Sequence, residues 1–148
     1  MSARAFKMAV LIGTIFCCLS RGAEAATPLL VMKCSEPKGT TISLEGGKIQ
    51  QGDDTISKQS YTIVIYRPDK GGFGRAVVVT EGKNNMNEQG SYRAYGYQDS
   101  VVVDITIMYD EATWTYSLFP KDHLLFIHST KLGVMGNPTA QLFVATCT

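Results

Sequence analysis

The sequence predicts an all-β domain, an antiparallel meander of about eight to nine strands closed or nearly closed into a barrel, with a β-sandwich as the alternative. Short runs of β-branched and aromatic residues are separated by Gly, Pro, Asn and Asp, which form turns. No window beyond the N-terminal leader has the period of an amphipathic helix. Cys34 and Cys147 stand at opposite ends of this β-rich region, so a bond between them would make the first and last strands neighbours.

Nine runs are predicted to be strands because they are rich in Val, Ile, Thr, Tyr and Phe and are bounded by turn residues. In chain order they are residues 29–33, 40–44, 61–67, 75–80, 92–98, 101–109, 113–119, 124–130 and 141–146. The predicted turns are 45–48, 68–72, 99–100, 110–111, 120–122 and 136–138.

Alternation of side chains along these runs predicts which face of each strand is buried. Val101, Val103, Ile105 and Ile107 share one face of their run, and Trp114, Tyr116 and Leu118 share one face of the next. The two runs form the clearest hairpin in the chain. Their apolar faces are expected to make the core, with the single tryptophan in it.

Residues 1–25 have the three parts of a secretory signal peptide, which leaves 26–148 as a single β domain. Arg4 and Lys7 give a positive start, 8–19 form a short apolar run, and Ala23-Glu24-Ala25 forms a cleavage site. An uncleaved anchor helix is the alternative. No later stretch reaches the ~20 apolar residues of a transmembrane helix, so no stable membrane insertion is expected.

The charge of the chain argues against nucleic acid as a partner. Removal of three basic residues and one acidic residue with the leader changes 14 basic and 13 acidic residues to 11 and 12. A domain this close to neutrality, without a basic run, has no electrostatic footprint for nucleic acid or an anionic membrane. The only Asn-x-Thr triplet of the domain has Pro138 in its middle position, which prevents N-glycosylation. Because the chain then carries no glycosylation site, a bacterial periplasmic or secreted location is expected.

Cys34 and Cys147 are predicted to form a disulfide, because they are the only cysteines outside the leader and an exported chain meets oxidising conditions. A redox function would need a Cys-x-x-Cys motif or a thiol beside a cation, and neither cysteine has that setting.

The sequence predicts no catalytic residue, no metal site and no cofactor. His123 and His128 are five residues apart on a strand, which places them on opposite faces, and His128 is expected to be partly buried. Gly-x-Ser-x-Gly is missing. The acidic pairs 53–54 and 110–111 are expected to lie in turns, where Asp caps the backbone.

Arg93, Tyr95 and Tyr97 form the candidate binding face, because they share one face of a predicted strand. Aromatic rings beside a guanidinium suit stacking on sugars, flat ligands or a partner protein. The alternative is cross-strand packing of the tyrosines with their hydroxyls at the rim. The polar, Asn-rich segment 81–90 before this strand is expected to be a loop.

Trp114-Thr115-Tyr116-Ser117, the terminal Ala145-Thr146-Cys147, the leader and the early cysteine together resemble small, functionally uncharacterised exported β proteins of proteobacteria. This resemblance implies a fold type and an exported location. In architecture alone the chain is also similar to periplasmic lysozyme inhibitors of C-type, but 90–95 departs from their Ser-Gly-x-x-Tyr motif.

These observations favour a non-catalytic periplasmic or secreted binding module that acts on a protein, a glycan or a small ligand. An inhibitor of an envelope hydrolase of lysozyme type is one alternative and a small hydrolase is another. The hydrolase would require converging polar groups that the sequence does not supply.

Overall fold

A computed structural model describes residues 27–54, 58–68, 73–82, 85–97, 100–132 and 137–148, without the side chains of Asp54 and Tyr97. Every regular element in this part of the chain is a β-strand. The strands are β1 (Pro28–Cys34), β2 (Lys38–Glu45), β3 (Lys48–Asp54), β4 (Gln59–Tyr66), β5 (Gly74–Gly82), β6 (Met86–Tyr97), β7 (Ser100–Met108), β8 (Ala112–Phe119), β9 (Leu124–Leu132) and β10 (Pro138–Thr146).

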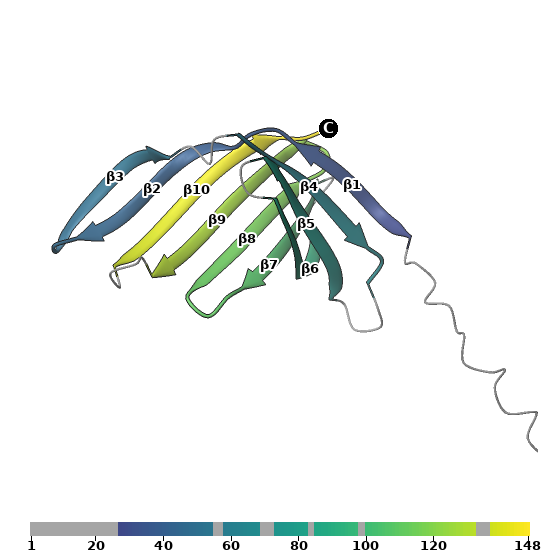
Figure 1. The fold of residues 1–148 in the computed structure, drawn as a ribbon. Coiled ribbons are helices and arrows are strands. Elements are labelled where there is room, and N and C mark those ends of the chain that lie inside the picture. The colour runs from purple at the N-terminus through teal and green to yellow at the C-terminus, as the bar shows by residue number, and fades with distance from the viewer. Residues whose placement is uncertain (1–26, 55–57, 69–72, 83–84, 98–99, 133–136) are drawn as a thin grey trace, which may run out of the picture.

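All ten strands belong to one antiparallel sheet in the order β1-β4-β5-β6-β7-β8-β9-β10-β2-β3. From β4 to β10 each strand pairs with the next in the chain, as expected for a meander. The β2–β3 hairpin is added beyond β10 and turns at Gly46 and Gly47, both with positive φ. Two such residues in succession fit a tight hairpin turn, so the turn predicted here is confirmed. The sheet curls strongly, and its strands converge near the C-terminus and fan out from there (Figure 1).

The curled sheet is a half-barrel, so the prediction of a closed or nearly closed barrel is correct for the curled meander but not for its closure, and the alternative of a two-sheet sandwich is wrong. β1 pairs with β4, whereas β2, the continuation of the chain after β1, pairs with β10. β1, an edge strand of the sheet, therefore meets the end of β10 only where β1 itself ends. There Cys34 and Cys147 form a bridge and a disulfide, and the amides of Lys33 and Thr148 each donate to the other's carbonyl, at 3.0 and 2.7 Å. The predicted disulfide is thus part of the fold. Closure is confined to one corner because the chain changes partner between β1 and β2.

The core lies on the inside of the curl, and we call this side of the sheet the inner face. Side chains alternate along β4, β5 and β7 to β10, and the inner set of these strands is mostly buried. Tyr116 links distant parts of this face, because its ring contacts Tyr61 of β4 and stacks on Trp114 of β8. The prediction that the apolar faces of β7 and β8 form the core is confirmed for most of their residues, which are buried. Val101 is exposed instead, and Trp114 is only partly buried against the core. The large, fully buried apolar side chains are Ile63, Ile65, Val78, Ile105, Leu118, Leu125, Ile127 and Phe143.

Polar groups also enter the inner face, and hydrogen bonds satisfy them. The hydroxyl of Ser129 donates to Gln141 at 2.9 Å, and the Gln141 amide donates to Thr41 at 3.1 Å. This chain of bonds crosses β9, β10 and β2. It holds together strands whose inner residues here are too polar for apolar packing alone.

The predicted strands are all present, but their number and some boundaries were wrong. β3 was not predicted, and it contains Asp53, which was expected in a turn. The segment 81–90 was expected to be a loop, yet β5 extends to Gly82 and β6 begins at Met86. β3 and the described parts of 81–90 are polar, and strand pairing decides their conformation because their backbone groups pair with a neighbouring strand.

The predicted leader, 1–25, and the first residue of the predicted domain fall outside the described residues. Within the described ranges, no helix is long and apolar enough to cross a membrane.

Candidate functional site

The candidate site lies on the outer face of the sheet, opposite the core, where β6 and β7 pair. Arg93 stands directly opposite Asp104, and Ser91 stands opposite Thr106. Tyr95 follows Arg93 on the same face, because side chains two residues apart along a strand point the same way. The intervening Tyr92 is buried, which confirms that this set faces outward. The strand alternation therefore brings Arg93 and Tyr95 together as predicted.

Phe73 adds an aromatic ring from outside the strand. It immediately precedes β5, whose first residue, Gly74, pairs with Tyr92 of β6. The Arg93 guanidinium carbon lies 4.8 Å from the centre of the Phe73 ring, within the range of a cation–π contact. A second contact of this kind lies nearby on the outer face, where the Arg75 guanidinium is 4.2 Å from the Tyr66 ring.

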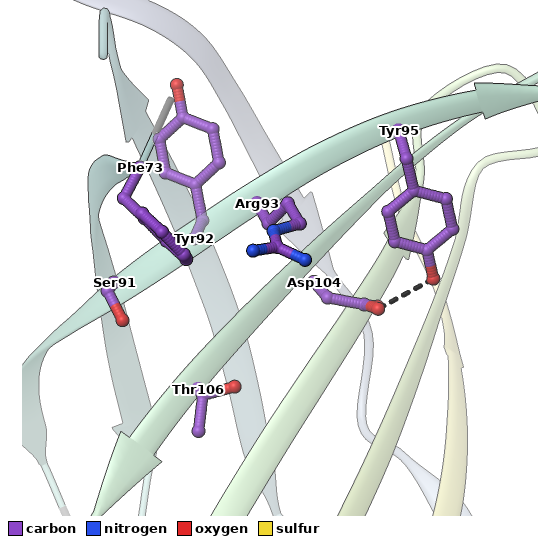
Figure 2. Close-up of a pocket in the computed structure, with 7 residues that line it drawn as sticks. All are labelled: Phe73, Ser91, Tyr92, Arg93, Tyr95, Asp104 and Thr106. Atoms are coloured by element: carbon purple, nitrogen blue, oxygen red, sulfur yellow. Dashed lines mark hydrogen bonds between the residues drawn. The ribbon is translucent and has the colours of Figure 1, made fainter. Parts of the chain in front are cut away.

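Tyr95 and Asp104 are joined by a short hydrogen bond. The Tyr95 hydroxyl donates to Oδ2 of Asp104 at 2.6 Å (Figure 2). This bond raises the pKa of Tyr95 above its ordinary value, because the carboxylate stabilises the protonated phenol, with smaller contributions from desolvation and charge repulsion. Tyr95 is nevertheless 50 % exposed, so its ring is open to solvent and to a ligand.

The other carboxylate oxygen of Asp104 has no such partner. Among the described residues, Oδ1 is buried without a hydrogen bond. The guanidinium of Arg93, on the facing strand, lies over Phe73, and no ion pair joins it to Asp104 within this described set. A buried acceptor without a hydrogen bond costs about 1–3 kcal/mol of stability. A hydrogen-bond donor that reached this oxygen would therefore stabilise the site.

These side chains enclose a shallow pocket of about 470 Å³. Figure 2 shows Arg93 between Phe73 on one side and Asp104 on the other. The pocket is lined by Phe73, Ser91, Tyr92, Arg93, Tyr95, Asp104 and Thr106. It therefore offers one cation, one anion, three hydroxyl groups near its surface and aromatic rings.

Tyr92, whose ring lies on the inner side of β6, fixes the strands behind the pocket. Its hydroxyl donates to the carbonyl of Tyr66 at 2.7 Å, a bond that spans from β6 over β5 to β4. The ring packs directly against Gly74, where any side chain would collide with it. Gly74 therefore permits the close approach that holds β4, β5 and β6 in place beneath Phe73 and Arg93.

The structure places the predicted residues as follows. Arg93 and Tyr95 line the pocket, whereas Tyr97 ends β6 and its side chain lies outside the described part of the chain. Sequence reasoning missed Asp104 and Phe73. The turn predicted at 99–100 would place Thr106 opposite Arg93, so Asp104 is found only from the observed pairing of Tyr97 with Ser100. Nothing in the sequence places Phe73 under Arg93.

A second hollow, of about 650 Å³, lies where the β7–β8 turn meets the β2–β3 and β9–β10 hairpins. Its apolar side chains include Ile49 and Met108, which are 77 and 78 % exposed. Sequence reasoning missed this hollow because part of its wall is β3, which was not recognised as a strand.

The two histidines lie apart from the pocket. His123 precedes β9 with a positive φ and accepts a hydrogen bond from the Cys147 amide through its carbonyl, at 2.7 Å. His128 is exposed, not partly buried as predicted, because it faces outward between Thr115 and Leu142. Within the described ranges, no three His, Cys, Asp or Glu residues are grouped as metal ligands would be.

Comparison of the chain with protein-family models, curated proteins and solved structures finds no match. Function is therefore inferred from the chemistry of the pocket. Its groups can donate and accept hydrogen bonds, stack on a flat surface and balance charge. Arg93 and Asp104 are the only ionisable side chains besides the tyrosines among its described lining residues.

Proposed function

We propose that this protein is an exported, non-catalytic binding module that captures its ligand on the outer face of β6 and β7. The single observation that carries the proposal is the convergence of Arg93, Tyr95, Asp104 and Phe73 around one open pocket. Aromatic rings and arginine are the side chains most enriched at binding hot spots. Tyr95 and Phe73 are half-exposed or more, so neither is needed to fill the core.

The proposed location outside the cytoplasm has independent support from the disulfide, because such bonds persist in oxidising compartments. N-terminal sequencing of the exported protein tests it. We expect a mature chain that begins at Ala26. Retention of Met1, with association to membranes that resists high salt and alkali, would contradict this location.

The binding proposal is tested by replacing Arg93 and Tyr95 with alanine together. Extract of the bacterial envelope is passed over the immobilised mature domain, and both capture and thermal unfolding are compared with the wild type. We expect capture to be lost, with a loss of affinity of ~2 kcal/mol or more, while the melting profile stays near that of the wild type.

The matched control is Arg75→Ala, which removes a guanidinium from a similar aromatic contact that does not line the pocket. It is expected to leave capture unchanged. If the double variant melts much lower while its folded fraction still captures the partner, the tyrosine has a packing role and the proposal is wrong. No observation on the described residues favours hydrolase inhibition or hydrolysis, so the proposal is confined to binding.

A further inference from the structure

The balance of charge in the β6–β7 pocket restricts what it can bind. Arg93 and Asp104 lie on facing positions of neighbouring strands, so one positive and one negative charge share the same small volume. An anionic ligand that is attracted by Arg93 is repelled by the nearby Asp104 carboxylate. A cationic ligand that is attracted by Asp104 is likewise repelled by Arg93. The pocket therefore suits a ligand without net charge.

The hydrogen-bonding groups impose a second requirement. Arginine can only donate and an ionised aspartate can only accept. The Tyr95 hydroxyl donates its hydrogen bond to Asp104, which leaves its oxygen able to accept a hydrogen bond from a ligand. A ligand must therefore donate and accept at closely spaced atoms. Neighbouring hydroxyl groups on a ring do both.

The rings of the pocket impose a third requirement. Phe73 is 57 % exposed and Tyr95 is 50 % exposed, and their faces are apolar. Tight small-molecule sites bury most of the surface of their ligand. In this open pocket a small molecule would instead leave much of its surface in water. A linear polymer can instead lie along an open strand face and use several units at once.

We propose, building on the binding function proposed above, that this pocket binds an uncharged glycan chain. The C–H face of one sugar ring packs on the exposed aromatic rings. Its hydroxyl groups accept from Arg93 and donate to the Tyr95 oxygen. When the sugar covers Phe73, the displaced guanidinium turns toward Oδ1 of Asp104, which then gains the donor that it lacks in the ligand-free protein.

The inference is tested by nuclear magnetic resonance titration of the labelled mature domain with three soluble probes of equal length: cellohexaose, chitohexaose and a hexamer of galacturonate. At least one of the two neutral hexamers is expected to shift the amides of β6 and β7, and the anionic hexamer should bind at least several-fold more weakly. Arg93→Ala and Asp104→Asn should each lower the affinity about tenfold or more. Arg75→Ala should preserve it, and well-dispersed spectra verify the fold of each variant.

Three results would overturn the glycan inference: no shifts with either neutral hexamer, shifts that map away from β6 and β7, or equal binding by Arg93→Ala. Capture of an envelope protein that depends on Arg93 and Tyr95, without oligosaccharide binding, would refute the glycan inference and leave the binding proposal intact. If substitution of Arg93 and Tyr95 abolishes neither the capture of an envelope protein nor the binding of an oligosaccharide, both the glycan inference and the binding proposal are refuted.

Discussion

The rings of Tyr61 and Tyr116 meet on the inner face of the sheet, with centroids 6.2 Å apart and planes inclined by 50°. They come from β4 and β8, which are not neighbours in the sheet, so this contact ties one half of the curl to the other. Burial and the charge of Glu88 raise the pKa of Tyr61 to about 12, and burial is also the main reason that the pKa of Tyr116 is raised.

Stability is therefore expected to fall in alkaline solution. The pKa of an unfolded tyrosine is about 10, so the unfolded chain loses its tyrosine protons first as the pH rises. The contribution of Tyr61 is fully present below about pH 10 and is lost by about pH 12. Urea unfolding at a series of alkaline pH values checks this, and Tyr61→Phe should flatten the decline. A free energy of unfolding that is constant across this range would contradict the burial of a neutral phenol.

The bond between Tyr95 and Asp104 predicts a different titration on the outer face. Asp104→Asn removes the charged acceptor, so the pKa of Tyr95 should fall toward its ordinary value. The ultraviolet absorbance of tyrosinate, compared between the single variant and the double variant with Tyr95→Phe, isolates this residue. The pKa of Tyr109, which is raised by burial and by its bond to Glu88, serves as the internal control and should not change. An unaltered Tyr95 titration would show that this bond does not persist in solution.

Gly74→Ala is expected to destabilise the domain by about 1–3 kcal/mol, the usual cost of overpacking, because the new methyl group collides with the Tyr92 ring. Chemical denaturation measures the change. Gly52→Ala is the matched control, since a methyl group on this β3 residue meets no other atom within 4 Å. Similar stabilities for the two variants would mean that Tyr92 is not packed against Gly74.

Loss of the disulfide is expected to lower the stability by about 4–5 kcal/mol in the chain-entropy model, because the bridge closes a loop with a sequence separation of 113. Cys34→Ser with Cys147→Ser should be compared with the oxidised wild type by denaturant unfolding. Peptide mapping without reduction identifies the bond directly. Free thiols in the native protein would contradict the pairing of the two ends.

The elements of this fold were more predictable than its closure. Alternation marked most inner residues of β7 and β8 correctly, because one face of each strand is largely buried, although Val101 at the start of β7 is exposed. β3 carried no such signal, since both faces of Lys48–Asp53 are exposed. Whether β1 pairs with β10 along its whole length and closes the barrel depends on how the chain bends between Cys34 and Lys38. A strand pattern does not encode that bend.

The site was predictable only along its own strand. Arg93 and Tyr95 share a face by simple alternation, whereas the role of Asp104 depends on the register of β6 with β7. Phe73 reaches Arg93 through the entry to β5, and contacts of that kind arise from tertiary packing alone.

The corner formed by Cys34 and Cys147 is the point at which β1 and β10 are held together. The disulfide and the reciprocal backbone hydrogen bonds of Lys33 and Thr148 join the two strands there. Away from this corner, β1 pairs with β4 and β10 pairs with β9. Resistance to local opening should therefore decline with distance from the corner. Amide hydrogens of Lys33 and Thr148 should exchange with solvent slowly, and those of the outermost strand, β3, much faster.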